Sequence, residues 1–224
     1  MAINKRVASM DDALADLRDG MTVFISGFGG AGFPNALLGR MLELRHGDLT
    51  LVAHSAIHRL SRTHELVEAG LVRKIICTGA RRPDGQRTLM DQLIADGKVE
   101  IELVPQGTFA ERIRAGGAGI PGFYTAVAAG TKLAAGKETK QFDGREHILE
   151  RAISGDLALI AADAADRFGN VSFRFTQLNF AAVMAAAAKL CVAQVRRFEE
   201  VLLLPDIGLP GVYVDRAVVV DESA

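Results

Sequence analysis

The sequence is poor in aromatic side chains and cysteine. Its 224 residues include no tryptophan, two tyrosines and two cysteines. An aromatic platform on which nucleic-acid bases or sugars could stack is therefore not expected. Cys77 and Cys191 lie far apart, each inside an apolar run, and form neither a metal-ligand spacing nor a redox motif. We expect both to be buried as small hydrophobic side chains.

The chain also has no block of one charge and no long apolar segment. Lys and Arg total 26 against 27 Asp and Glu, so the formal net charge is −1 and offers no electrostatic footprint for a nucleic-acid backbone. No apolar run approaches the roughly 20 residues that a membrane-spanning helix needs. The first residues have no apolar signal-peptide core. We therefore expect a cytoplasmic protein with neither a nucleic-acid nor a membrane partner.

Short apolar runs alternate with amphipathic stretches and glycine-bearing turns. Strands are predicted at residues 21–26, 49–53, 72–77, 99–104, 157–162, 171–175, 190–195 and 217–220, and helices at 10–18, 36–44, 63–69, 88–95 and 179–189. Residues 136–149 predict a small β excursion and residues 115–122 a glycine-rich loop. This alternation predicts an α/β fold with an open, mostly parallel sheet and helices on both faces. Neither a repeat nor a linker interrupts it, so residues 1–224 are expected to form one domain.

A glycine-rich loop follows the strand predicted at 21–26. Gly27, Gly29 and Gly32 have the GxGxxG spacing, between a strand and a helix, that is typical of dinucleotide binding. Such a site also needs a carboxylate at the end of the next strand, but that strand ends at His54-Ser55, and Asp48 precedes it. A nicotinamide site is therefore disfavoured. An anion or acyl-carrier site built from backbone N–H groups and the helix N-terminus remains, with a plain tight turn as the alternative.

The same loop resembles a longer signature. Residues 19–34 read Asp19-Gly-Met-Thr-Val-Phe-Ile-Ser-Gly-Phe-Gly-Gly-Ala-Gly-Phe-Pro34 and are similar to the first signature of the family I CoA-transferases, in the group of their A subunits. Only Ser26 departs, where the family has glycine. Residues 104–125 resemble the family's second long motif, and shorter matches follow at 136–138, 142–145, 166–170 and 209–216. The resemblance extends from about residue 10 to residue 220.

The resemblance implies a CoA-transferase fold and a ping-pong reaction. CoA would pass from an acyl-CoA, succinyl-CoA being common, to the carboxylate of a 3-oxo acid such as acetoacetate or 3-oxoadipate, through a thioester on an active-site glutamate. In two-subunit members that glutamate belongs to the B subunit. The expected partner is therefore the B subunit, in a heterodimer or an α2β2 heterotetramer, with the CoA thioester as substrate and no permanently bound cofactor or metal. Glu68 and Glu111 are expected to be structural, so the nucleophile is not expected in this chain.

The resemblance also assigns candidate site residues. They are Ser26, Gly27, Phe28, Gly29, Gly30, Ala31 and Gly32 for CoA binding, Gln106 as donor to the thioester oxygen, and His54, Ser55, Gly117 and Gly119 for substrate contact. Each has a structural alternative: a strand-end cap for Gln106, a packing turn for the glycines, a purely structural imidazole for His54.

Several departures concern the substrate. His54-Ser55 replaces a common asparagine pair, residues 125–130 lack the usual Thr-Pro-Thr-Gly-Tyr-Gly, and residues 161–166 lack the lysines seen in relatives. These changes leave other functions open: a transferase for short-chain acids with acetyl-CoA, an acyl-CoA hydrolase, or a non-catalytic CoA-binding or scaffold subunit.

Overall fold

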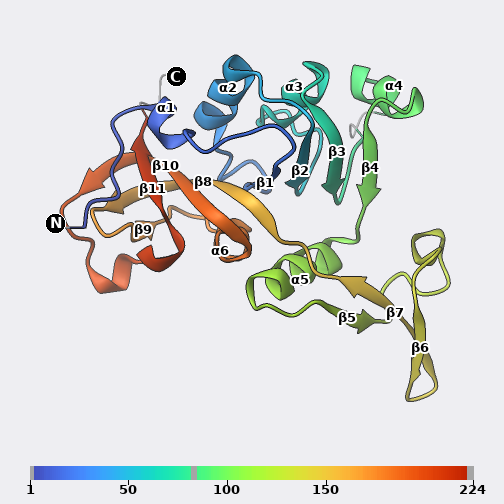
Figure 1. The fold of residues 1–224 in the computed structure, drawn as a ribbon. Helices are drawn as coiled ribbons and strands as arrows, with labels where there is room; N and C mark the ends of the chain where they lie inside the picture. The colour runs from blue at the N-terminus through green and yellow to red at the C-terminus, as the bar shows by residue number, and fades with distance from the viewer. Residues whose placement is uncertain (1–2, 82–84, 221–224) are drawn as a thin grey trace.

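Residues 3–81 and 85–220 are described in this computed structural model. The main sheet has the strand order β11-β10-β8-β1-β2-β3-β4, with β9 paired to β8 (Figure 1). The strands are β1 (Thr22–Ile25), β2 (Leu49–Ala53), β3 (Val72–Cys77), β4 (Glu100–Leu103), β8 (Gly155–Asp166), β9 (Val171–Ser172), β10 (Ala188–Glu199) and β11 (Arg216–Val219). All pairs along the main order are parallel, and β9 is antiparallel to β8. The carboxyl ends of β1, β2, β4, β8 and β10 therefore meet at one edge of the sheet, where ligand sites of such folds lie.

Helices cover both faces of this sheet, as predicted (Figure 1). They are α1 (Met10–Ala13), α2 (Asn35–Leu44), α3 (Thr63–Glu68) and α4 (Leu89–Ala95) on one face, and α5 (Gln106–Gly117) and α6 (Ala181–Ala187) on the other. Side chains alternate along each strand, so each face has its own apolar core. Val23 and Ile25 of β1 belong to the core under α1–α4, whereas Phe24 between them belongs to the core with α5 and α6.

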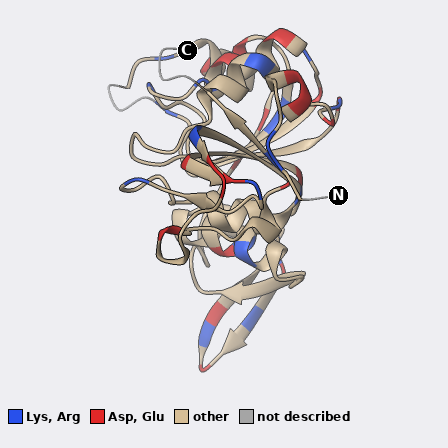
Figure 2. Ribbon diagram, turned by 90° about the vertical axis from the view of Figure 1, so that its left-hand side faces the viewer, with Lys and Arg blue, Asp and Glu red and all other residues tan. Residues whose placement is uncertain are grey.

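A second, three-stranded sheet protrudes beyond α5 (Figure 1). It has the order β5-β7-β6 and is antiparallel, with β5 (Gly122–Thr125), β6 (Thr139–Phe142) and β7 (Arg145–Arg151). The short helix η1 (Lys132–Ala134) lies between β5 and β6. This sheet is the β excursion predicted from the sequence, enlarged by β5. Lys or Arg and Asp or Glu both occur on its hairpin, as they do along the rest of the ribbon (Figure 2).

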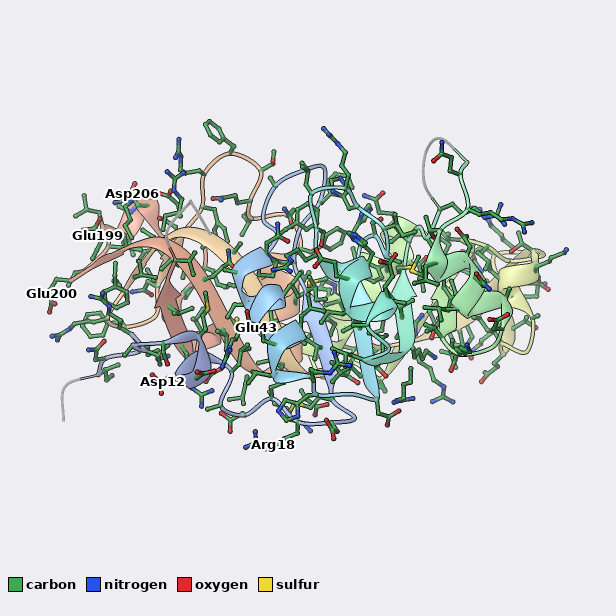
Figure 3. The ribbon with its side chains drawn as sticks, turned by 90° about the horizontal axis from the view of Figure 1, so that it is seen from above. Asp12, Arg18, Glu43, Glu199, Glu200 and Asp206 are labelled. Atoms are coloured by element: carbon green, nitrogen blue, oxygen red, sulfur yellow. The ribbon has the colours of Figure 1, made fainter. Side chains whose placement is uncertain are left out.

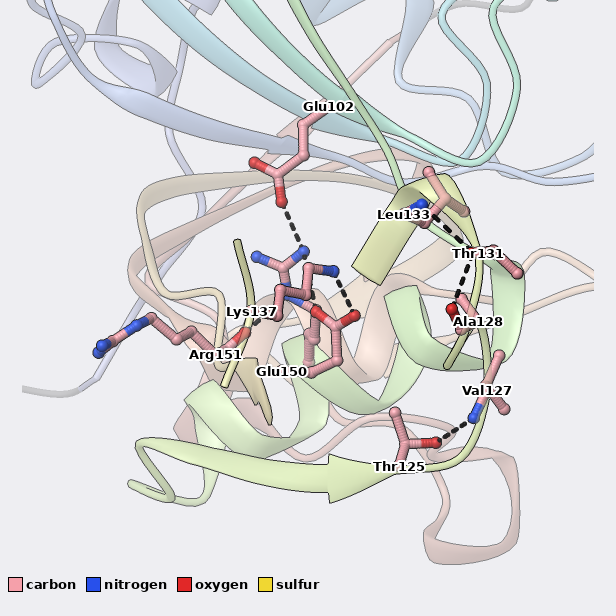
Figure 4. Close-up of polar contacts among 10 residues, drawn as sticks. Glu102, Thr125, Val127, Ala128, Thr131, Leu133, Lys137, Glu150 and Arg151 are labelled. Atoms are coloured by element: carbon pink, nitrogen blue, oxygen red, sulfur yellow. Dashed lines mark hydrogen bonds and ion pairs between the residues drawn. The ribbon is translucent and has the colours of Figure 1, made fainter. Parts of the chain in front are cut away.

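A cluster of ion pairs joins this excursion to the main sheet (Figure 4). Arg112 of α5 contacts Glu102 of β4 at 2.6 Å and Glu150 of β7 at 3.8 Å, and its Nε donates to the Arg151 carbonyl. Lys137 contacts the other oxygen of Glu150, whose side chain is only 2% exposed. Burial by itself would raise the pKa of Glu102, but hydrogen bonds from its cationic partners outweigh burial and lower that pKa. Each charge of this cluster therefore has a partner of opposite sign, and the ion pairs link β4, α5 and β7.

Some elements differ in length from the prediction. The first helix ends at Ala13 rather than at residue 18, because the chain turns at Leu14 and the Arg18 guanidinium donates to the Ala15 and Leu17 carbonyls. Strands β8 and β10 each have 12 residues, about twice the predicted length, because they pair with each other through their second halves. The predicted strand at 171–175 stops at Ser172, and Phe175 has a positive φ of 51°.

The expectation for the two cysteines is confirmed. Cys77 and Cys191 are buried and unpaired. Desolvation raises the pKa of the Cys77 thiol to about 11 and raises the pKa of the Cys191 thiol as well, so both stay protonated at neutral pH. Across residues 3–81 and 85–220, no helix has the length and apolar character that crossing a membrane requires.

Candidate functional site

Three segments that the sequence analysis singled out meet at the carboxyl edge of the sheet. The glycine loop follows β1, His54 follows β2, and Gln106 begins α5 shortly after β4. The Phe28 ring meets the His54 imidazole edge-on at 4.5 Å between centroids, and the Gln106 side chain lies close enough to His54 to raise its pKa. Phe180, at the start of α6, stacks on His54 at 5.6 Å between centroids. We call Phe28, His54, Gln106 and Phe180 the site cluster.

His54 is held as a neutral imidazole. Burial among aromatic rings is the main reason that its pKa is lowered, the hydrogen bond with Gln106 acts in the opposite direction, and the charge of His58 lowers the pKa slightly further. The Nε2 atom of His54 is buried and has no hydrogen-bond partner within the described residues. A neutral imidazole can donate or accept a hydrogen bond according to its tautomer, so Nε2 is a buried polar atom left without a partner in the described part of the chain.

The glycine loop is a tight hairpin with an exposed tip. Phe28 and Ala31 exchange two backbone hydrogen bonds of 3.0 and 3.1 Å, which places Gly29 and Gly30 at the turn. Both have positive φ angles, 60° and 96°, as a two-residue hairpin turn requires. A Cβ on Gly29 would meet nothing within 4 Å, so the backbone at the tip is open to a ligand. The CoA contact predicted for this loop is therefore expected mainly at its tip, residues 28–30.

The base of the loop is closed by side chains. Ser26, 1% exposed, donates to the Gly32 carbonyl at 2.6 Å and accepts from the Ala161 N–H. Asn179 accepts from the Gly27 N–H at 3.2 Å and donates to the Ala31 carbonyl at 3.1 Å. The side chain of Ser26 thus has a loop-closing role, and a CoA contact by this residue stays a prediction. No local sequence signal marks Asn179 as a loop-closing residue, because its partners Gly27 and Ala31 lie about 150 positions earlier in the chain.

The N-terminus of α2 does not contribute to an anion site. The N–H groups of Ala36 and Leu37 both donate to Oε1 of Gln194, at 3.1 and 3.2 Å, and Asn35 N–H donates to the Phe33 carbonyl. The expectation that this helix N-terminus presents free N–H groups is therefore wrong. Gln194 lies on β10, about 160 positions further along the chain, so no local sequence signal predicts it.

The other predicted substrate residues have structural roles. Ser55 donates to the Ile57 carbonyl at 3.0 Å. Gly117 lies against α6, where a Cβ would come within 3.0 Å of the Ala186 backbone. Gly119, at φ 70°, forms the left-handed residue that ends α5. At about 1.5 Å per residue, the length of α5 separates Gly117 from Gln106 by about 16 Å. Substrate contact by Ser55, Gly117 and Gly119 stays a prediction.

The two glutamates considered as nucleophiles lie outside the site cluster. Glu68 ends α3, and Gly70 follows at φ 73°, so this segment is a helix cap at the edge of the sheet opposite the cluster. Glu111 is paired with Arg114 at 2.6 Å on the surface of α5. The site cluster itself contains no carboxylate. Among residues 3–81 and 85–220 no group of His, Cys, Asp and Glu side chains could hold a metal ion.

A comparison with known protein families identifies the family of this chain. The family described as Coenzyme A transferase matches residues 7–220 of the chain. The chain belongs to the coenzyme A transferase family. The resemblance drawn from the glycine loop and from residues 104–125 is therefore confirmed, and with it the predicted enzyme class.

Curated relatives place the chain among the A subunits of this family. It is 41% identical over 224 residues to the A subunit of 3-oxoadipate CoA-transferase from Pseudomonas putida, covering 99% of this chain and 96% of the relative. It is also 41% identical over 217 residues to the A subunit of succinyl-CoA:3-ketoacid coenzyme A transferase from Helicobacter pylori, covering 95% of this chain and 90% of the relative.

A solved structure agrees on the fold. Glutaconate coenzyme A-transferase from Acidaminococcus fermentans superposes with a TM-score of 0.84 at 19% identity, covering 96% of this chain and 76% of that one. At this identity the likeness supports the fold alone. The predicted α/β fold, similar to that of CoA-transferases, is thereby confirmed.

Proposed function

We propose that this chain is the A subunit of a heteromeric CoA-transferase. It works with a B subunit to move CoA from an acyl-CoA, succinyl-CoA foremost, to the carboxylate of a 3-oxo acid. The observation that carries the proposal is the site cluster. It offers an amide donor and a neutral imidazole beside an open glycine loop, at the sheet edge where ligands bind, and has no nucleophile of its own.

The reaction divides into two acyl exchanges. A glutamate carboxylate of the B subunit attacks the thioester carbonyl, which forms an acyl-glutamyl anhydride and releases the CoA thiolate. The thiolate then attacks the glutamyl carbonyl, giving a glutamyl-CoA thioester and the free donor acid. The acceptor carboxylate reverses both steps and leaves as the new acyl-CoA. Each step passes through a tetrahedral oxyanion, which needs fixed hydrogen-bond donors.

The residues of this chain take supporting roles in that scheme. The Gln106 amide donates to the developing oxyanion. The backbone at Gly29 and Gly30 contacts CoA. The imidazole of His54 contacts the bound acid. No permanently bound cofactor is required, and the complex is a heterodimer or an α2β2 heterotetramer in the cytoplasm.

Reconstitution tests the proposal. The chain is mixed with its B subunit, and transfer from succinyl-CoA is followed with acetoacetate, 3-oxoadipate and acetate as acceptors. We expect transfer to a 3-oxo acid that requires both proteins. Preference for acetate would identify a short-chain-acid transferase, and CoA release without an acceptor a hydrolase. A tight complex that binds CoA but turns over none of these would support the scaffold alternative instead.

A further inference from the structure

The side chain of Asn179 connects the glycine loop to the turn that begins α6. Its Oδ1 accepts hydrogen bonds from the Gly27 N–H at 3.2 Å and from the Phe180 N–H at 2.6 Å. Its Nδ2 donates to the Ala31 carbonyl at 3.1 Å and to the Thr176 carbonyl at 2.9 Å. We propose that Asn179 is a positioning residue that holds the glycine loop in the conformation that contacts the acyl-CoA, an inference that rests on the proposed CoA-transferase function.

The first reason is that one amide group reaches both arms of the hairpin. Gly27 lies before the turn and Ala31 after it, and the amide bonds to a backbone group in each arm. An amide side chain offers two donor hydrogens and two acceptor lone pairs, and the four hydrogen bonds of Asn179 use them all. Aspartate, a side chain of the same length, lacks the donors when ionised, and alanine lacks both groups. The two arms are therefore held together by a set of bonds that neither residue can replace.

The second reason is the backbone of the loop itself. Four of the six residues from 27 to 32 are glycines with positive φ angles, and such a backbone has wide conformational freedom. The segment before α6 packs directly on this loop: a Cβ at Gly32 would come within 2.7 Å of the Gln177 carbonyl oxygen. Asn179 thus lies where its amide can supply the restraint that the glycines do not.

The third reason is that Asn179 is itself held in place by its neighbour Phe180. The Phe180 ring meets Phe109 of α5 at 5.4 Å between centroids, and Phe109 is fully buried. The same ring stacks on His54 and meets Phe28 edge-on at 6.3 Å between centroids. The loop is therefore fixed in two places, at its base by the Asn179 amide and at Phe28 by the aromatic contacts.

A residue that positions a CoA contact should act on KM more than on kcat, because that contact is made before and during the reaction alike. Asn179→Ala removes the bonds to both arms and should raise KM for the acyl-CoA about five- to thirtyfold, while kcat changes by less than about threefold. Asn179→Asp keeps an acceptor for the Gly27 N–H but turns a carboxylate oxygen toward the Ala31 carbonyl. We expect a similar rise in KM for this variant. Asn179 is only partly buried in a turn, so both variants should fold.

Asn170 provides the matched control. It is also partly buried, and its amide likewise joins two segments: it accepts from the Gly211 N–H at 2.8 Å and donates to Asp166 at 2.9 Å. Asp166 lies opposite Glu199 in the pairing of β8 with β10. Glu199 is at one end of the molecule, away from Glu43 of α2, the helix that follows the glycine loop (Figure 3). Asn170→Ala should therefore destabilise the chain without changing KM for the acyl-CoA.

The experiment measures KM and kcat for each variant in complex with the B subunit, with melting curves beside them. Hydrogen exchange of the isolated full-length chain is the second readout. The amides of residues 27–32 should exchange at least about tenfold faster in Asn179→Ala than in wild type, and at an unchanged rate in Asn170→Ala.

A normal KM in either Asn179 variant would overturn the proposal, whatever the exchange rates show. An equal rise of KM in Asn170→Ala would also overturn it, because the effect would then be one of general stability. Failure of the proposed function reads differently, as a wild-type complex that binds acyl-CoA but transfers no CoA. In that case the dissociation constant of the acyl-CoA replaces KM, and the same comparison of variants decides the role of Asn179.

Discussion

Substitution of Gln106 by alanine removes the amide that is proposed to donate to the oxyanion. Gln106 is the first residue of α5, exposed, and in contact with His54, so its truncation leaves no cavity. A surface substitution of this kind changes stability by about 0.5 kcal/mol or less. A hydrogen-bond donor to an oxyanion, in contrast, stabilises the transition state by about 2.7–4 kcal/mol, and a weaker neutral hydrogen bond stabilises it by about 1 kcal/mol. At about 1.36 kcal/mol per factor of ten, Gln106→Ala should slow transfer by about ten- to a thousandfold.

The assay is kcat for CoA transfer by the reconstituted complex, with the melting temperature of each variant measured beside it. Gln106→Glu keeps the shape of the side chain but removes its N–H donors, and it should lose as much activity as Gln106→Ala. Gln141→Ala, an exposed glutamine on the β6 hairpin, is the matched control and should keep full activity. Unchanged turnover of the folded Gln106→Ala complex would refute the donor role and leave Gln106 as a helix-start residue.

Three further predictions concern pH, CoA binding and stability. The lowered pKa of His54 means that the folded state favours the neutral ring, so the stability that His54 contributes is present above pH 6.5 and is lost as pH falls below that value. Between about pH 7 and 5.5, His54→Asn should therefore lose less unfolding free energy than wild type in urea titrations. Parallel losses in the two proteins would contradict this. Gly29→Ala should raise KM for acyl-CoA several-fold, whereas Gly144→Ala, also at positive φ with open space around it, bears the same backbone cost of about 1–2 kcal/mol without changing KM. An equal KM in the two variants would leave the loop as a plain turn. Arg112→Met leaves the buried Glu150 and the partly exposed Glu102 short of a partner and should cost about 3 kcal/mol of unfolding free energy. Arg114→Met, from an exposed pair, should cost less than about 1 kcal/mol, and equal losses in urea titrations would show that the buried ion pairs do not stabilise the fold.

The strand and turn pattern of the main sheet is largely predictable from the sequence. The predicted bounds of β2 and β3 coincide with the observed ones. A turn signal precedes each strand, Asp48 before β2 and Gly70 before β3. The alanine-rich second half of β8, by contrast, extends beyond the strand predicted there. Its small side chains give little pattern, yet they pair with β10 as far as Asp166.

The glycines of α5 show why local composition can mislead. Residues 115–122 are predicted as a loop because glycine disfavours helices. The helix nevertheless continues to Gly117, because a Cβ at Gly116 would come within 2.1 Å of the Ile153 carbonyl oxygen and one at Gly117 would meet Ala186. Glycine is needed there for close packing, which only the tertiary structure reveals.

The site is predictable where one local motif carries it and not where distant segments meet. The exposed glycine tip and the strand-end position of His54 follow from spacing alone. The contact of Gln106 with His54, the loop closure by Asn179 and the capping of α2 by Gln194 join segments about 50 to 160 residues apart. No local pattern specifies such pairs, and His54 gains its lowered pKa only from that assembled surrounding.

The central claim is that this chain supports a thioester that forms on its partner. The most direct measurement is to incubate the reconstituted complex with succinyl-CoA, trap the intermediate with borohydride, and locate the reduced residue by peptide mass spectrometry. The account predicts one reduced glutamate on the B subunit, none on this chain, and trapping sharply diminished by Gln106→Ala. A reduced residue on this chain, Glu68 included, or efficient transfer with no trappable intermediate, would contradict it.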